Sequence, residues 1–171
     1  FSFPLVSHLV FPLFPQPPAA IFEESFDRLD PARWREVAIN GHTRYQIEQL
    51  DGFSSLQASS QSGASILVTP LRVDPHRHPW VTWRWRVDQL VQGEDLSRKE
   101  GSDASARVYV YFDTSGHHWQ KRNIDYVWSA TLPVDTVLES PHSKNSKILV
   151  VESGSEHLGS WQMVKRNVPE D

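Results

Sequence analysis

The stretch Val81-Thr82-Trp83-Arg84-Trp85-Arg86-Val87-Asp88 alternates apolar and polar side chains. Successive side chains of a strand point to opposite faces, so this period of two predicts a β-strand with one buried face. The side chains expected in the core are Val81, Trp83, Trp85 and Val87. The side chains expected on the other face are Thr82, Arg84, Arg86 and Asp88. A strand buried on one side only is typical of antiparallel all-β domains.

The same alternation recurs along the chain between turn signals. The strand candidates span residues 21–26, 34–39, 43–50, 54–59, 65–73, 80–90, 106–113, 124–131, 147–153 and 161–168. Asn40-Gly41, Asp51-Gly52 and Ser62-Gly63 supply residues that tolerate positive φ, as hairpin turns require. Pro31 is placed to start a turn before residue 34. No segment has a clear amphipathic helical period. The pattern therefore predicts an antiparallel β-sandwich or jelly roll of about ten strands over residues 21–171.

Two longer stretches, residues 92–105 and 133–146, are polar and rich in turn residues. We expect them to form long loops, which on a compact sheet are often functional. Gly93-Glu94-Asp95 and Gly101-Ser102-Asp103 are oxygen-rich pieces of the first loop, and they could hold a structural calcium ion, although no EF-hand pattern occurs. We expect no other cofactor.

The composition excludes several classes of protein. A chain of 171 residues can bury a core without disulfides or metal. It has no cysteine, which rules out disulfides, zinc–thiolate sites and a thiol nucleophile. Its 17 Lys and Arg against 21 Asp and Glu leave a net charge of −4, without the positive excess that nucleic-acid binding needs. Walker loops, dinucleotide fingerprints and nucleophile elbows are also absent from the sequence.

The first twenty residues differ in character from the rest. Residues 1–13 are mostly apolar, and a proline cluster and Ala19-Ala20 follow them. The prolines and the short length argue against a membrane-spanning helix. An apolar run that ends in small residues resembles the remnant of a secretory signal peptide cleaved near Ala20. An N-terminal arm packed on the domain is the alternative. We expect a periplasmic or secreted protein with no transmembrane span.

Residues 106–113 offer a second strand with a polar side. Its expected core residues are Val108, Val110 and Phe112, and its opposite face holds Arg107, Tyr109, Tyr111 and Asp113. If this strand shares a sheet with residues 81–88, Arg84 and Arg86 join the same surface. Arg side chains bind carboxylate, sulfate or phosphate groups through paired donors, and Tyr rings offer flat surfaces to sugars. The alternative is ordinary cross-strand pairing on an exposed sheet face.

The strand at residues 124–131 can be phased in two ways. Either Tyr126 and Trp128 face outward as ligand platforms, or they pack inward and place Asp125 beside a guanidinium group. The segment 161–168 likewise has no decisive phase. The candidate ligand-binding residues are Arg84, Arg86, Arg107, Tyr109, Tyr111, Asp113, Asp125 and Trp128. On this hypothesis, alanine in place of Arg84 or Arg107 abolishes ligand retention and leaves the melting temperature nearly unchanged.

Histidine and carboxylate clusters give weaker signals. His76-Arg77-His78 and His117-His118 stand beside proline or glycine, so we expect surface histidines and no metal site. Glycoside hydrolysis needs two carboxylates at a fixed separation. Asp113, Asp125 and Glu152 lie on or beside predicted strands, but no motif ties any two of them together.

Five segments stand in a characteristic order. They are Trp83–Val87, Asp103–Val110, Tyr126–Trp128, Val150–Gly154 and Trp161–Val168. Together they resemble a bacterial family of exported proteins known only as a domain of unknown function, over residues 22–171. The resemblance implies a signal peptide, a single all-β domain and an envelope or secreted location, and it supplies no catalytic residues. It also implies a closing strand after Asp171, so we expect a fragment of a family member.

Three functions are compatible with these features. The first is non-catalytic binding of a polar or anionic ligand, a glycan or an envelope component, on the Arg- and Tyr-rich face. The second is a carbohydrate-active hydrolase or lyase that uses Asp113, Asp125 or Glu152 with a Tyr or Arg. The third is a structural partner in an envelope complex. Because β-sandwiches host all three, the fold does not choose between them.

Overall fold

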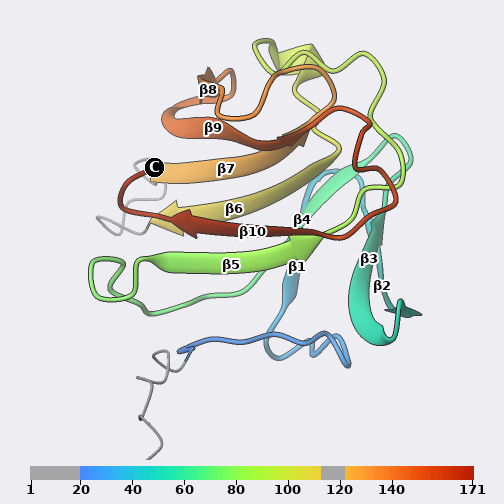
Figure 1. Ribbon diagram of the computed structural model, residues 1–171, viewed down its shortest axis with the longest axis vertical. Helices are drawn as coiled ribbons and strands as arrows, with labels where there is room; N and C mark the ends of the chain where they lie inside the picture. The colour runs from blue at the N-terminus through green and yellow to red at the C-terminus, as the bar shows by residue number, and fades with distance from the viewer. Residues whose placement is uncertain (1–19, 113–121) are drawn as a thin grey trace, which may run out of the picture. The chain divides into compact units, whose positions relative to one another are not determined.

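The computed structural model describes residues 20–112 and 122–171, and Figure 1 labels its strands β1 to β10. Within these residues the only helical element is the 3₁₀ turn Lys99–Gly101, so the predicted all-β class is confirmed. None of the described helical segments could cross a membrane. The leader predicted for residues 1–20 lies almost entirely outside the described residues, as do Asp113 and His117-His118.

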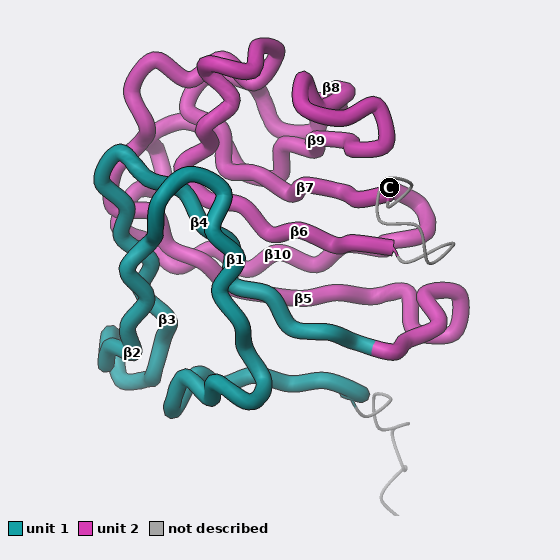
Figure 2. Tube along the Cα trace, turned by 180° about the vertical axis from the view of Figure 1, so that it is seen from behind, with its two compact units in different colours: residues 1–71 teal, residues 72–171 magenta. Residues whose placement is uncertain are grey.

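The chain divides into two compact units, residues 1–71 and residues 72–171 (Figure 2). The domain predicted for residues 21–171 therefore contains two units. Unit 1 has two pairs of antiparallel strands. β1 (Arg35–Asn40) pairs with β4 (Ala64–Val68), and β2 (Arg44–Leu50) pairs with β3 (Phe53–Ser59). Asp51 and Gly52 join β2 to β3 with φ of 54° and 87°, and this double positive φ is the hairpin geometry that the sequence predicts.

The strand predicted for residues 21–26 is wrong, because this segment has no ladder partner in the described structure. Side-chain contacts hold it instead. The Glu24 carboxylate accepts hydrogen bonds from the Trp34 indole N–H at 2.8 Å and from the Phe26 backbone N–H at 3.0 Å. The Phe22 and Phe26 rings lie 6.4 and 5.6 Å from the Trp34 ring. The apolar alternation here thus reflects aromatic packing on Trp34.

Unit 2 contains a four-stranded sheet and a two-stranded sheet (Figure 1). The larger sheet has the order β6 (Ala106–Phe112), β7 (Arg122–Ser129), β9 (Ser143–Ser153) and β8 (Val137–Ser140). The smaller sheet pairs β5 (Trp80–Trp85) with β10 (Gln162–Asn167). Two predictions are wrong here. The sheet was expected to be antiparallel throughout, but β7 and β9 run parallel. Residues 133–146 were expected to form a loop, but they contain β8, whose Leu138 packs into an apolar cluster.

The apolar faces of the two sheets pack on each other and form the main core of unit 2. The buried core residues are Trp85, Val87, Ile124, Tyr126, Trp128, Leu149, Val164 and Val168. The partly buried residues packed against them include Val81, Trp83, Val108, Val110 and Phe112. The inward faces predicted for residues 81–87 and 108–112 are therefore confirmed. A second cluster covers the other side of the larger sheet with Leu96, Val127, Ile148 and Val150.

Candidate functional site

The two arginine-bearing strands present their polar sides to opposite surfaces of unit 2. β5 pairs with β10 and not with β6, and the apolar sides of β5 and β6 meet in the core. Arg84 therefore lies on the outer side of the β5–β10 sheet, and Arg86, just after β5, forms an ion pair with Asp88 at 2.7 Å. Arg107 and Tyr109 lie on the outer side of β6. The single surface expected for all these residues is not formed.

The larger sheet instead brings together a group of polar residues that we call the outer polar cluster. Its members come from β6, β7, β9 and the loop before β6, and they are Ser102, Arg107, Tyr109, Tyr111, Asn123, Asp125 and Ser146. The register explains the grouping. Tyr109 stands opposite Asp125, and Tyr111 stands opposite Asn123. On the other side of β7, Asn123 stands beside Ser146.

A buried ion pair lies at the centre of the outer polar cluster. Arg107 Nη1 donates to Asp125 Oδ2 at 3.2 Å, and the two side chains are only 14% and 4% exposed. The second Arg107 amino group donates to the backbone carbonyl and the hydroxyl oxygen of Ser102. The Asn123 amide donates to Asp125 Oδ1 and to the Ser146 hydroxyl oxygen. Both oxygens of Asp125 are thus hydrogen-bonded, as buried carboxylates require.

Burial dominates the titration of the Asp125 carboxyl. Removal from water raises the pKa of Asp125 from its ordinary 3.8 to about 6, against the attraction of Arg107 and the hydrogen bond from Asn123. At neutral pH the carboxylate balances the Arg107 guanidinium, and below about pH 6 the pair gains one positive charge. The cluster is therefore neutral under ordinary conditions.

Two tyrosines form the exposed part of the cluster. The Tyr109 and Tyr111 rings stack with centroids 5.7 Å apart and an angle of 17° between their planes. Tyr109 is half-buried, whereas Tyr111 is 48% exposed. Desolvation raises the pKa of Tyr109, and it raises the pKa of Tyr111 to about 12. The hydroxyl groups of both tyrosines therefore stay protonated at neutral pH. The two rings offer an apolar surface that carries neutral hydroxyl groups.

Residues 32–171 match the family described as "Protein of unknown function (DUF3047)". The chain belongs to this family. The DUF3047 match includes all ten described strands and every member of the outer polar cluster. The resemblance to a domain of unknown function is thus confirmed, and the bacterial and exported character that it implied stays a prediction. Neither the curated proteins nor the solved structures give a match.

Trp128 belongs to the core of this DUF3047 chain and not to a ligand surface. It is 0% exposed and packs with Trp85, and its indole N–H donates to the Gly154 carbonyl at 3.1 Å. Tyr126 is also fully buried, so the inward phase of β7 holds and Asp125 gains its guanidinium partner. The expectation that Trp128 contacts a ligand is wrong, because the core fills the space around its ring.

The carboxylates named for hydrolysis do not form a pair in the described structure. Asp113 lies outside the described residues. Asp125 stands beside Ile148, and Glu152 comes four residues later on β9, about 13 Å along the strand. Glu152 stands beside the inward-facing Trp128, and its Oε1 lies 3.2 Å from His157 Nδ1. This offset along the backbone is larger than the roughly 5–9.5 Å at which glycosidases hold their two carboxyl groups.

Two acids of the loop predicted as a calcium site, Glu94 and Asp95, accept hydrogen bonds from protein groups. The buried Glu94 carboxylate accepts the Ser129 hydroxyl and the Ala130 backbone N–H, the latter at 2.9 Å. Asp95 accepts from Ser97 Oγ and Arg98 Nε, each at 2.6 Å. A cavity of about 390 Å³ adjoins this loop, lined by residues 93–98, Thr131, Leu132 and Leu138. The described residues contain no group of three potential metal-ligating side chains, and calcium stays a prediction.

Sequence reasoning missed three members of the cluster, Ser102, Asn123 and Ser146. Ser102 was named only as part of a possible calcium loop. Asn123 lies just before the predicted strand 124–131, but β7 begins at Arg122, and extending the period of two by one residue would have placed Asn123 on the same face as Asp125. Ser146 had no such signal, because residues 133–146 were expected to form a loop, whereas β9 begins at Ser143. The pairing of β7 with β9 brings Ser146 to Asn123.

Proposed function

We propose that unit 2 is a non-catalytic binding module that holds a neutral polar ligand, a glycan, on the outer polar cluster. The observation that carries this proposal is the stacked Tyr109–Tyr111 pair, with Tyr111 48% exposed, beside the largely buried Arg107–Asp125 ion pair. The faces of sugar rings are apolar and pack on aromatic rings, while hydroxyl groups at their edges need polar partners.

The charge of the cluster favours a neutral ligand over an anionic one. Arg107 is already paired with Asp125 and hydrogen-bonded to Ser102, so an incoming carboxylate or phosphate would have to displace a partner. It would also approach a buried carboxylate, which repels it. A hydroxyl group meets neither penalty, because it donates and accepts without a net charge.

The titration of the tyrosines supports binding over hydrolysis or lysis. A general base works best when its pKa lies near the operating pH. Burial moves the pKa values of Tyr109 and Tyr111 upward and away from neutrality. Asp125, whose pKa burial raises to about 6, is the one cluster residue that meets this criterion, but its two oxygens already accept hydrogen bonds from Arg107 and Asn123. These features favour a binding surface over a site at which a side chain transfers a proton to or from a substrate.

Two further features belong to this proposal. The packing of the β5–β10 sheet on the larger sheet supports a β-sandwich as the architecture of unit 2. A periplasmic or secreted location, predicted from residues 1–20, would bring the module to extracellular or envelope glycans.

A glycan-array screen of the full chain tests the proposal, combined with assays for reducing sugars and unsaturated products. We expect neutral glycans to bind without product. In Tyr111→Ala, affinity should fall about fivefold to tenfold with little change in melting temperature, because a half-exposed aromatic contact is lost. Tyr111→Phe keeps the ring and should retain most of the affinity.

Val137→Ala is the matched control, because Val137 is 56% exposed on β8 of the same sheet. Its affinity should equal that of the unmodified chain. Formation of product would support the hydrolase or lyase alternative instead. Absence of neutral glycan binding, or equal affinities for Tyr111→Ala and Val137→Ala, would overturn the proposal.

A further inference from the structure

The side of the β5–β10 sheet that faces away from the core forms a second surface, which we call the β5–β10 outer face. Its residues are Trp80, Thr82 and Arg84 on β5 and Met163, Lys165 and Asn167 on β10. They alternate with the inward-facing side chains of Val81, Trp83 and Val164, so they share one side of the sheet. The core separates this face from the outer polar cluster.

Large apolar side chains are unusually exposed on this face. Met163 is 70% exposed and Trp80 is 56% exposed. Single exposed apolar residues are common on protein surfaces, but two on so small a sheet, one of them a tryptophan, form a feature that needs an explanation. Both side chains are long enough to reach into an adjoining apolar phase while the backbone ladder stays intact.

The charged residues of the β5–β10 outer face are both cations, and they lie against aromatic rings. Lys165 Nζ is 4.5 Å from the centre of the Trp80 ring. The Arg84 guanidinium is 5.8 Å from the ring of Trp161, the residue before β10. None of the six outward positions is acidic, although the whole chain has a net charge of −4. This face therefore favours an anionic partner against the charge of the chain as a whole.

We propose that the β5–β10 outer face docks unit 2 onto an anionic lipid bilayer. Tryptophan is favoured at the headgroup level of membranes, and Lys and Arg extend along apolar surface to keep their charges among anionic headgroups. Trp80 and Met163 would enter the interface, and Lys165 and Arg84 would meet the lipid phosphates. A soluble polyanion would use the charges but would offer no apolar phase for Met163.

Docking in this orientation would leave the outer polar cluster facing away from the membrane, because the core lies between the two surfaces. The module would then present Tyr111 to solvent while it is held at the bilayer. The inference goes beyond the proposed glycan binding and does not depend on it.

Co-sedimentation of the full chain with large unilamellar vesicles tests this proposal. Vesicles of phosphatidylcholine with phosphatidylglycerol are compared with vesicles of phosphatidylcholine alone. We expect binding to the anionic vesicles that weakens at high salt. Lys165→Gln should lower the partition coefficient about fivefold, the effect of one basic residue near an anionic surface. Met163→Ser should also lower it, because the apolar contribution is lost.

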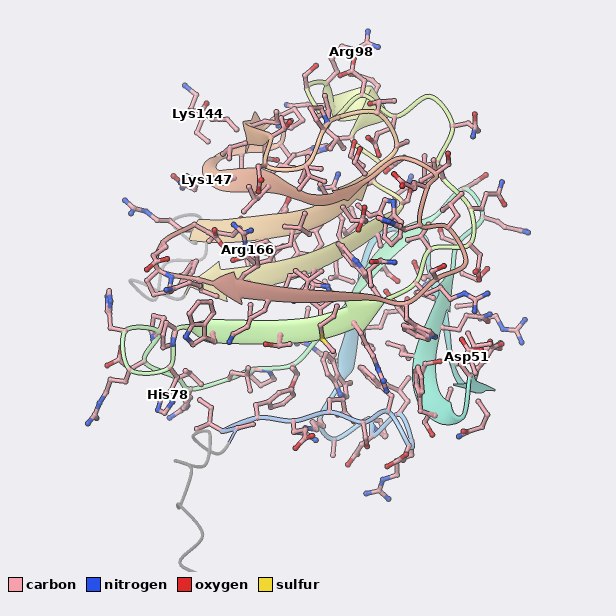
Figure 3. The ribbon with its side chains drawn as sticks, in the orientation of Figure 1. Asp51, His78, Arg98, Lys144, Lys147 and Arg166 are labelled. Atoms are coloured by element: carbon pink, nitrogen blue, oxygen red, sulfur yellow. The ribbon has the colours of Figure 1, made fainter. Side chains whose placement is uncertain are left out.

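Lys144→Gln is the matched control, because Lys144 is an exposed lysine at the start of β9, labelled in Figure 3, and lies outside the β5–β10 outer face. Its partition should be unchanged. Circular dichroism melting of each variant separates loss of folding from loss of docking. The proposal is overturned if anionic vesicles do not bind, if neutral vesicles bind equally, or if Lys144→Gln matches Lys165→Gln. Dextran sulfate, a soluble polyanion, tests the apolar contribution. If Met163→Ser binds anionic vesicles and dextran sulfate as well as the unmodified chain does, Met163 contributes nothing, and the face binds soluble polyanions instead. Tyr111→Ala should leave partition unchanged, which keeps this result separate from glycan binding.

Discussion

Replacing Asp125 with asparagine should change how the free energy of unfolding depends on pH. Burial raises the pKa of Asp125 from 3.8 to about 6, because loss of water outweighs the attraction of Arg107. A carboxyl with a higher pKa in the folded state binds more protons there between those two values. Its contribution to stability is therefore fully present below the unfolded pKa, and it is lost as the pH rises from about 4 to about 6.

The size of the effect follows from the difference between the two values. A rise from 3.8 to about 6 spans about two pKa units, and each unit corresponds to about 1.4 kcal/mol. Asparagine does not titrate, so Asp125→Asn lacks this dependence. The free energy of unfolding of the unmodified chain, minus that of Asp125→Asn, should fall by about 3 kcal/mol between about pH 4 and about pH 7. The other carboxyls are the same in both chains, and their contributions cancel.

Urea unfolding of both chains across this pH range, at constant ionic strength, measures the difference. A difference that stays flat or rises with pH would refute the reasoning, because it would mean that Arg107 attracts the carboxylate more strongly than burial disfavours it. The carboxyl carbon resonance of Asp125 provides a direct check, since its chemical shift should titrate with a midpoint near pH 6. A midpoint below 3.8 would contradict the same argument.

Three further predictions concern the core and its edges. Trp128→Phe should lower the free energy of unfolding by about 2–4 kcal/mol in urea, because it leaves a cavity and removes the donor to the Gly154 carbonyl. Gly154→Ala should lower the free energy of unfolding by about 1–2 kcal/mol in the same assay, because Gly154 has a φ of 68°, which alanine rarely adopts. No steric clash adds to this cost, because nothing lies within 4 Å of the position that the Cβ would take. Burial tends to raise the pKa of Asp171, but hydrogen bonds from Arg166 and Tyr126 outweigh it and lower the pKa. Asp171→Asn should therefore destabilise the chain at neutral pH, and the loss should shrink as acid protonates the carboxyl below its ordinary pKa near 4.

The strands that bury one face were predictable from the sequence. Residues 81–87 alternate strictly, and the hydrophobic effect alone decides which side of such a strand is buried. The hairpin at Asp51-Gly52 was predictable for a local reason, because few residues tolerate positive φ at both turn positions. In each case the signal and the structure lie within the same few residues.

Pairing between distant strands was not predictable in the same way. Alternation tells which face of a strand is buried, but it does not name the neighbouring strand. The parallel pairing of β7 with β9 therefore had no local signal. β8 was not predicted because it is only four residues long, Val137–Ser140, and only Leu138 among them packs into an apolar cluster. A short edge strand with one buried side chain looks like a loop in sequence.

The candidate site was predictable in part. Asp125 beside a guanidinium group was one of two open phases for its strand, and the structure selects it through the burial of Tyr126 and Trp128. The choice depends on the space between the two sheets, which takes both aromatic rings. No single strand contains that information, because the space is defined by residues far apart in the chain.

The separation of Arg84 from Arg107 changes what a binding experiment on either residue can mean. Both were expected to contact one ligand and to be dispensable for folding. Arg107, however, is buried in an ion pair, and removal of one partner of such a pair costs about 3–5 kcal/mol because a charge is left without compensation. Loss of binding in Arg107→Ala would therefore reflect lost structure as much as a lost contact. Arg84 lies on the opposite side of the core, so a ligand that depends on Arg84 should not depend on Tyr111. Parallel measurements on variants of Arg84 and Tyr111, both on exposed positions, can assign a ligand to one face or the other without that ambiguity.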